Sequence, residues 1–157
     1  MEIVLLTVGK TTQSYVQAGI EEFSKRLRHY LPYKIECLPD IKGGKSMTPD
    51  AQKEKEGEMI LNYLSAADQC ILLDEHGSEF TSVGFSGYLQ KIMACGRKRA
   101  VFVVGGPYGF SKNVYQRADS KLSLSKMTFT HEMIRLFFTE QVYRAMTILR
   151  GEPYHHE

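Results

Sequence analysis

AVFVVGGPYGFS, residues 100–111, joins a run of aliphatic residues to a loop with glycines at 105, 106 and 109, here called the glycine loop (residues 105–109). An apolar run of this length, bounded by glycine, is typical of a buried strand. Glycine lets backbone approach a ligand closely, and open α/β sheets bind small molecules at the carboxyl ends of their strands. The stretch therefore predicts a strand over 100–104, followed by a binding loop or, with about equal weight, by a simple tight turn.

The rest of the chain repeats this alternation of strand and helix. Further strands are expected at 3–8, 34–38, 70–73 and 121–124, and segments of helical period at about 16–30, 49–64, 88–93 and 131–150. Such alternation predicts an α/β fold with a mostly parallel sheet flanked by helices. The chain has 157 residues, of which 43% are hydrophobic and 24% charged, and this predicts one domain over residues 1–157.

Composition excludes several classes of protein. The apolar runs are far shorter than the ~20 residues that cross a bilayer, and Glu2, with no basic segment after it, argues against a signal peptide. Three cysteines, Cys37, Cys70 and Cys95, lack CxxC spacing, which favours reduced thiols over disulfides or zinc. We therefore expect a soluble, cytoplasmic protein that contacts no membrane and needs no metal. The net charge of +2 does not by itself predict nucleic-acid binding.

Two segments resemble known phosphate-binding motifs, but neither has all the residues that its motif requires. Gly44-Lys45-Ser46 lies between a strand and a helix, as in a Walker A loop, but Pro39 stands where that motif needs its first glycine. The glycine loop lacks the G-x-G-x-x-G spacing of a dinucleotide site, and no acidic residue follows at the usual distance. The sequence therefore argues against a P-loop NTPase and against a Rossmann oxidoreductase.

Three loops are instead expected to meet at one edge of the sheet. Leu73-Asp74 ends a predicted buried strand, the glycine loop ends another, and LSLSKMTF (residues 122–129) follows the last strand with several small hydroxyl residues. The carboxyl ends of parallel strands share an edge, so these loops predict a pocket whose backbone groups are suited to an adenosine.

The last helix and the tail carry the remaining polar candidates. Arg135, Glu140 and Arg144 lie on the helix, and the simplest interpretation of Glu140 and Arg144 is a surface ion pair worth a few tenths of a kcal/mol. The tail GEPYHHE (residues 151–157) is either a solvated end or, stiffened by Pro153, a segment that leaves the helix and reaches over a neighbouring subunit. His131 is expected to have a structural role.

VFVVGGPYGFS and LSLSKMTFTHEMIRLFFTEQVYRAMTILRGEPYHHE, with LDEHGSEFTS before them, resemble the bacterial ribosomal RNA large subunit methyltransferase H family of the SPOUT superfamily. The resemblance covers the whole chain and is strongest in the C-terminal half. It implies a SPOUT-type sheet with a C-terminal trefoil knot, a homodimer, and S-adenosyl-L-methionine as cofactor. Pattern reasoning alone would have excluded a knot.

The resemblance also assigns residues. It implies cofactor contacts at Leu73, Gly105, Leu124, Ser125, Lys126, Met127, Thr128 and Phe129. It implies a catalytic group near the target base, formed by Glu140, Arg144, Tyr154 and His155, with the tail of one subunit completing a site on the other. Many members have arginine after the Tyr-His pair, where this chain has His156.

The activity implied by the resemblance is methylation of N3 of a pseudouridine in 23S rRNA, at position 1915, and it is expected to take place on assembled ribosomes. The expected partners are therefore the rRNA within the ribosome and a second copy of the chain. The cofactor supplies an activated methyl group, so the protein chiefly orients and dehydrates the reactants. Arg144 suits stabilisation of an N3 anion, and Glu140 or His155 suits the base. Two alternatives are a ribosome-associated binding protein without catalysis and a SPOUT methyltransferase that acts on tRNA.

Overall fold

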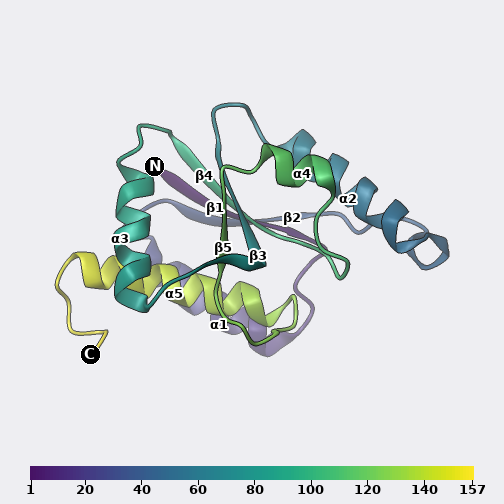
Figure 1. The fold of residues 1–157 in the computed structure, drawn as a ribbon. Coiled ribbons are helices and arrows are strands. Elements are labelled where there is room, and N and C mark those ends of the chain that lie inside the picture. Colours follow the sequence, from purple (N-terminus) through teal and green to yellow (C-terminus); the bar gives the residue numbers. More distant parts are fainter.

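Five parallel strands form the central sheet of the computed structural model, which describes residues 1–157 (Figure 1). The strands are β1 (Glu2–Val8), β2 (Tyr33–Leu38), β3 (Gln69–Glu79), β4 (Arg99–Val104) and β5 (Ser120–Ser123), in the order β2-β1-β4-β3-β5. Every ladder between neighbours is parallel. The predicted α/β fold with a parallel sheet is confirmed.

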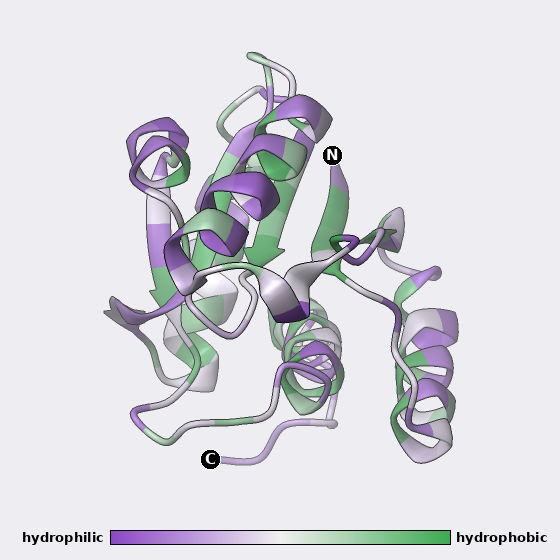
Figure 2. Cartoon of the chain, turned by 90° about the vertical axis from the view of Figure 1, so that its right-hand side faces the viewer, coloured by the Kyte–Doolittle hydropathy of each residue, from purple (hydrophilic) through white to green (hydrophobic).

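Helices cover both faces of this sheet. One face carries α1 (Ser14–Leu27), α3 (Ser82–Met93) and α5 (Met133–Leu149), and the other carries α2 (Pro49–Tyr63) and α4 (Lys112–Arg117). Ile3 and Leu5 belong to the first core and Val4 and Leu6 to the second, so β1 is buried on both sides. This explains its unbroken apolar run, and Figure 2 shows the apolar residues concentrated along the strands. None of the helices has the length and apolar character needed to cross a membrane.

The structure corrects the expected end of β3. The polar residues after Leu73 were expected to form a loop, but β3 continues to Glu79, and after a shift in register Ser78 pairs with Leu122 of β5. At the crossing, a Cβ on Gly77 would lie 2.6 Å from the backbone nitrogen of Leu122. Only glycine fits so close an approach, and a polar strand end has no apolar pattern that would reveal it.

Two helices also differ from expectation. The first helix ends at Leu27 and not near 30, and α4 was not predicted at all. It has six residues, capped by the side chain of Ser111, and is too short to give a periodic apolar signal.

The start of α5 shows why its predicted bound was two residues too early. The Thr130 hydroxyl accepts a hydrogen bond from the Met133 nitrogen at 3.1 Å, and the regular helix begins there. Glu132 turns away and accepts hydrogen bonds from the backbone nitrogens of Thr12 (2.7 Å) and Gln13 (3.0 Å) at the start of α1. These hydrogen bonds, that from Gln13 first, lower the pKa of Glu132 to about 2. One side chain thus fixes the beginning of α5 to the beginning of α1.

Arg135, expected among the polar groups of the last helix, is 1% exposed and lies in the interior. Its guanidinium donates to the carbonyl oxygens of Val8 (3.1 Å) and Gly9 (3.0 Å) and to the Thr11 hydroxyl (3.0 Å). These contacts satisfy a buried charge with the backbone that follows β1. Arg135 therefore has a structural role.

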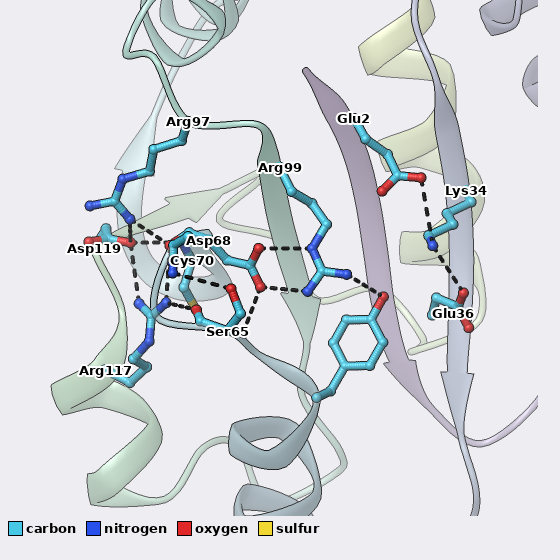
Figure 3. Close-up of polar contacts among 12 residues, drawn as sticks. Glu2, Lys34, Glu36, Ser65, Asp68, Cys70, Arg97, Arg99, Arg117 and Asp119 are labelled. Carbon is cyan, nitrogen blue, oxygen red and sulfur yellow. Dashed lines mark hydrogen bonds and ion pairs between the residues drawn. The ribbon is translucent and has the colours of Figure 1, made fainter.

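An ion pair joins the start of β3 to β4 (Figure 3). The Asp68 carboxylate accepts hydrogen bonds from Nε (2.8 Å) and Nη2 (2.6 Å) of Arg99 in a two-pronged arrangement. The Asp68 side chain is 4% exposed. Removing one partner of an ion pair so well shielded from water strongly destabilises the fold, because the other charge stays buried without a partner.

A second carboxylate fixes the entry to β5. Asp119 accepts a hydrogen bond from the Cys70 nitrogen at 2.8 Å and lies 3.3 Å from Arg97 and 3.4 Å from Arg117. Both arginines also donate to the main-chain oxygen of Asp68. Together these contacts hold the amino ends of β3, β4 and β5 in one network, visible in Figure 3.

Removing the buried carboxylate should destabilise the fold. We expect Asp68→Asn to lower the free energy of unfolding by about 3 kcal/mol at neutral pH, because Arg99 would lose its ionic partner. Arg99 holds the pKa of Asp68 below its usual range, so this stabilisation is present above the unfolded-state pKa and is lost as the pH falls through the folded one. Urea unfolding at several pH values checks both points.

The control for this measurement is Asp50→Asn, because Asp50 pairs with Lys53 at 3.6 Å but its side chain is 91% exposed. Its unfolding midpoint should match the wild type. Equal midpoints for wild type and Asp68→Asn at neutral pH would contradict the role given to the pair.

Candidate active site

A cavity of about 880 Å³ opens at the carboxyl edge of β3, β4 and β5. Its walls are residues 73–76 within the extended β3, the glycine loop and the segment between β5 and α5, which are the three stretches predicted to meet there. All eight residues expected to bind a cofactor line it: Leu73, Gly105, Leu124, Ser125, Lys126, Met127, Thr128 and Phe129. The predicted pocket exists, and its volume suits a ligand of nucleoside size. The binding role of each residue stays a prediction.

The glycine loop is both a tight turn and a cavity wall. A Cβ on Gly105 would lie 3.1 Å from the Phe110 ring, so this ring fills the space that a side chain at 105 would need. Gly109 has a φ of +81°, a conformation that favours glycine, and its nitrogen donates to the Gly106 oxygen at 3.2 Å. The two interpretations of the loop therefore do not exclude each other.

The wall opposite the glycine loop is a folded turn after β5. The Ser123 hydroxyl donates to the Ser125 carbonyl oxygen at 3.1 Å, and the Ser125 hydroxyl accepts from the Met127 nitrogen at 2.9 Å. These short-range bonds fix the backbone that faces the cavity. Met127 is 77% exposed and offers an apolar side chain at the edge of the cavity.

The sequence analysis did not predict a hydrogen bond between two polar residues that line the cavity, Tyr115 and Asp74. Tyr115 of α4 donates its hydroxyl to Asp74, which also accepts from the His76 nitrogen at 2.8 Å. Burial, and then the hydrogen bond to Asp74, raise the pKa of Tyr115 to about 12, so the hydroxyl stays a donor at neutral pH. Because α4 was not foreseen, no sequence signal connected Tyr115 with this edge.

The four predicted catalytic residues lie together at the far end of α5, and we call them the α5 cluster: Glu140, Arg144, Tyr154 and His155. Arg144 Nη2 donates to Glu140 Oε1 at 2.6 Å, and Arg144 Nη1 lies 3.2 Å from His155 Nδ1. The Tyr154 hydroxyl donates to the same Glu140 oxygen at 3.0 Å, and the guanidinium carbon lies 4.7 Å from the centre of the Tyr154 ring. The pair of Glu140 and Arg144 is thus part of a network and is more than a surface ion pair.

The tail does not leave the helix as expected but turns back onto it. Gly151 adopts a φ of +68°, and the Glu152 nitrogen donates to the Thr147 oxygen at 3.0 Å. Glu152 also accepts a hydrogen bond from the Tyr30 hydroxyl at 2.5 Å, which attaches the turn to the end of α1. The tail therefore packs Tyr154 and His155 against their own α5, whereas His156 is exposed.

The cavity and the α5 cluster are separate within one chain. No member of the α5 cluster lines the cavity, although Ile134 near the start of α5 does. Arg144 follows Ile134 by ten residues, which corresponds to about 15 Å along a helix axis. Within a single chain, the first turn of α5 thus borders the cavity, and the α5 cluster lies on the middle and second half of the same helix.

Comparisons with known proteins agree on the kind of protein. A family model described as "Predicted SPOUT methyltransferase" matches residues 1–155. Proteins named ribosomal RNA large subunit methyltransferase H are 58% identical over 157 residues in Parabacteroides distasonis and 56% identical over 157 residues in Flavobacterium johnsoniae, and in both cases the match covers 100% of each chain. The protein of this name from Christiangramia forsetii is 55% identical over 156 residues, or 99% of each chain.

Among solved structures, the chain is similar to the SpoU methyltransferase AviRb from Streptomyces viridochromogenes, solved in complex with AdoMet. The TM-score is 0.44 at 8% identity, and the match covers 96% of this chain. This chain spans 61% of the length of AviRb.

The network of the α5 cluster predicts what holds the tail. We expect Arg144→Ala to speed hydrogen exchange of the Glu152 amide, the tail amide that donates to Thr147, severalfold, since Arg144 contacts both Tyr154 and His155. The free energy of unfolding should change by less than about 1 kcal/mol, because the side chains remain partly exposed. Exchange followed by mass spectrometry measures the first and urea unfolding the second.

Lys25→Ala is the matched control, since Lys25 also pairs with a glutamate four residues away but is 61% exposed. It should leave exchange of the tail unchanged. A tail equally protected in Arg144→Ala and wild type would refute the anchoring role.

Proposed function

The chain belongs to the SPOUT methyltransferase family, and on this premise we propose that it transfers a methyl group from S-adenosylmethionine to N3 of a pseudouridine in 23S rRNA. The observation that carries the proposal is that the eight residues assigned to the cofactor by resemblance all line one cavity. The full-length identity of more than half to proteins named for methylation of large-subunit rRNA supports the substrate.

The lining of the cavity fits this cofactor. Apolar side chains, among them Leu73, Val104 and Leu124, suit an adenine ring, and the glycine loop and the turn after β5 offer main-chain hydrogen-bonding groups. When bound, S-adenosylmethionine supplies a methyl group already activated on a cationic sulfur.

The proposal includes a homodimer, because the two halves of the site lie apart within one chain. Beside the cavity, α5 exposes Phe137, which is 38% exposed and packs on Phe129 with ring centres 4.8 Å apart. An apolar surface of this kind suits contact with a second copy. In a symmetric dimer, the far end of one α5 would then complete the cavity of the partner. The trefoil knot stays a prediction of the resemblance, supported by the close crossing of Gly77 over β5.

Within the α5 cluster, Arg144 is the residue suited to the target base. N3 gives its proton to water before it attacks the methyl carbon, and a fixed guanidinium lowers the energy of the resulting N3 anion. Tyr154 offers a ring face for stacking, and burial raises the pKa of its hydroxyl, which therefore remains a donor.

Neither of the two candidates for the base, Glu140 and His155, is placed to accept the N3 proton in this arrangement. Its carboxylate already accepts hydrogen bonds from Arg144, Tyr154 and, at 2.8 Å, from Gln141 Nε2. We assign to Glu140 the orientation of Arg144 and Tyr154. Because arginine only donates, His155 Nδ1 accepts from Arg144, and the proton of the neutral imidazole then resides on Nε2. In this arrangement His155 is a donor toward the substrate.

The function is tested by binding and by product analysis. Wild-type protein should bind S-adenosylmethionine in calorimetry, and it should add one methyl group to 23S rRNA in ribosomes from a strain that lacks the activity, as read by mass spectrometry. Absence of binding would favour a non-catalytic ribosome-associated protein. Methylation of tRNA in place of rRNA would favour the tRNA alternative.

The glycine loop provides a mutational test of the cavity. Gly105→Val should weaken cofactor binding at least about tenfold, because the added atoms displace the Phe110 ring or enter the cavity. Gly87→Val is the matched control, since a Cβ on Gly87 of α3 meets no atom within 4 Å. Equal affinity in the Gly105→Val and Gly87→Val proteins would remove Gly105 from the site.

Mixed dimers test whether the site is shared. A Gly105→Val chain has a defective cavity and an intact α5 cluster, and an Arg144→Ala chain has the reverse. Each homodimer should be nearly inactive, whereas an equal mixture, after subunit exchange, should recover about a quarter of wild-type activity, from heterodimers with one working site each.

The control combines Arg144→Ala with a chain that lacks Tyr154 through Glu157. Because Arg144 and the tail belong to the same cluster, both clusters of that heterodimer are defective, and no activity should return. Recovery in this control, or none in the first mixture, would contradict a site made of one cavity and the partner's α5 cluster.

A further inference from the structure

One buried charge in the molecule has few hydrogen bonds and no ion pair to compensate it. Three charged side chains are buried, Glu56, Asp68 and Arg135, and the last two are satisfied by the contacts described above. Glu56 of α2 is 4% exposed, yet its carboxylate accepts one side-chain hydrogen bond, from Gln52 Nε2 to Oε1 at 3.2 Å. Its Oε2 atom accepts none from the protein and keeps some contact with solvent, since no fully buried side-chain oxygen or nitrogen lacks a partner. Burying a carboxylate with so little compensation is costly.

The carboxylate lies directly behind the glycine loop. A Cβ on Gly106 would lie 2.3 Å from Oε2 and 2.7 Å from Oε1 of Glu56, so the loop touches the carboxylate with only the glycine Cα between them. Gly106 also lines the cavity. Gly57, the residue after Glu56, packs α2 closely on Ser111, and this contact fixes Glu56 in its position.

The surroundings of Glu56 do not neutralise it. The charged group facing it from the loop after β2 is Asp40, whose like charge adds to burial in raising the pKa of Glu56. On α2, Lys53 pairs with Asp50 and Gln52 is neutral, while the glycine loop offers only Tyr108 as a titratable group. Lys53 and Lys126 line the cavity, but no lysine or arginine forms an ion pair with the Glu56 carboxylate.

A cationic ligand would supply the missing charge. A ligand atom in contact with Gly106 lies roughly 7 Å from the carboxylate, if ordinary contact distances hold on both sides of the glycine. At that distance, and at the effective dielectric constant of protein sites, one positive charge on the ligand is favoured by a factor on the order of ten or more.

We propose, on the basis of the function proposed above, that Glu56 is a specificity-determining residue that makes the cavity prefer cationic S-adenosylmethionine to neutral-sulfur S-adenosylhomocysteine. The two molecules share adenosine and amino-acid groups and differ in the methyl group and in the charge on sulfur. Transfer of the methyl group removes that charge, so the attraction present in the substrate complex is lost in the product complex. Glu56 thereby favours release of the spent cofactor.

The test compares affinities of three ligands by calorimetry: S-adenosylmethionine, S-adenosylhomocysteine and sinefungin, which carries an amine cation near the position of the transferred methyl. Glu56→Gln keeps the shape and removes the charge. We expect it to weaken S-adenosylmethionine and sinefungin about tenfold and to leave S-adenosylhomocysteine unchanged. Glu56→Asp, which keeps a charge, should retain part of the preference.

Glu58→Gln is the matched control, because Glu58 lies on the same helix but is exposed, and its ligand affinities should equal those of the wild type. Thermal unfolding should show Glu56→Gln to be at least as stable as wild type, since an underpaired buried charge is removed. If Glu56→Gln does not fold, Glu56→Met, whose side chain has a similar length and no charge, takes its place in the calorimetric test.

The outcomes separate cleanly. Equal loss of affinity for all three ligands would mean that Glu56 only supports the fold, and an unchanged ratio of affinities would mean that its charge is irrelevant; either overturns the inference and leaves the proposed function standing. Failure of the wild type to bind S-adenosylmethionine would overturn both.

Discussion

The pairing of β5 with β3 is the contact on which the rest of the site depends. β5 has four residues and β3 as its only neighbour in the sheet, yet the glycine loop and the turn after β5 face each other only when β5 is in place. A strand so short contributes little on its own. The network around Asp68 and Asp119 fixes its amino end, and the extension of β3 to Glu79 holds its carboxyl end. The cavity therefore depends on a short strand, β5, whose two ends are both held by contacts with residues of other segments.

The two ends of α5 have different tasks in this arrangement. Its first turns are fixed in the fold by Glu132 and Arg135, which bind the backbone after β1, and they border the cavity. Its middle and second half carry Glu140 and Arg144, against which the returning tail packs Tyr154 and His155. The helix places Arg144 ten residues, or about 15 Å along its axis, from Ile134 at the cavity, and no member of the α5 cluster lines the cavity of its own chain. This physical argument is the main support for a site shared between two subunits.

Features of the fold and the site could be predicted from the sequence where they arise from neighbouring residues, and could not where they depend on distant ones. The strand over 100–104, the glycine loop and the segment 122–129 carry local patterns, and the predicted pocket formed where they met. Leu73 and Asp74 were found at its edge for the same reason. The roles of Glu140, Arg144, Tyr154 and His155 came from resemblance, because their spacing alone fits a surface ion pair and a solvated tail. Arg135, Glu132 and Glu56 gained their roles from partners up to 127 residues away, which no local pattern encodes.

The close contact between Gly77 and β5 also determines the order in which these segments can pair during folding. Residues 69–79 leave the ribosome before residues 120–123 are made, so the close passage between Gly77 and Leu122 must be closed by the later segment moving against the earlier one. Contacts of such long sequence separation form slowly, because the chain loses loop entropy before it gains their energy. During synthesis the long β3 therefore waits with an unpaired edge, and the newly made protein is most exposed to mispairing in the interval before its last third arrives.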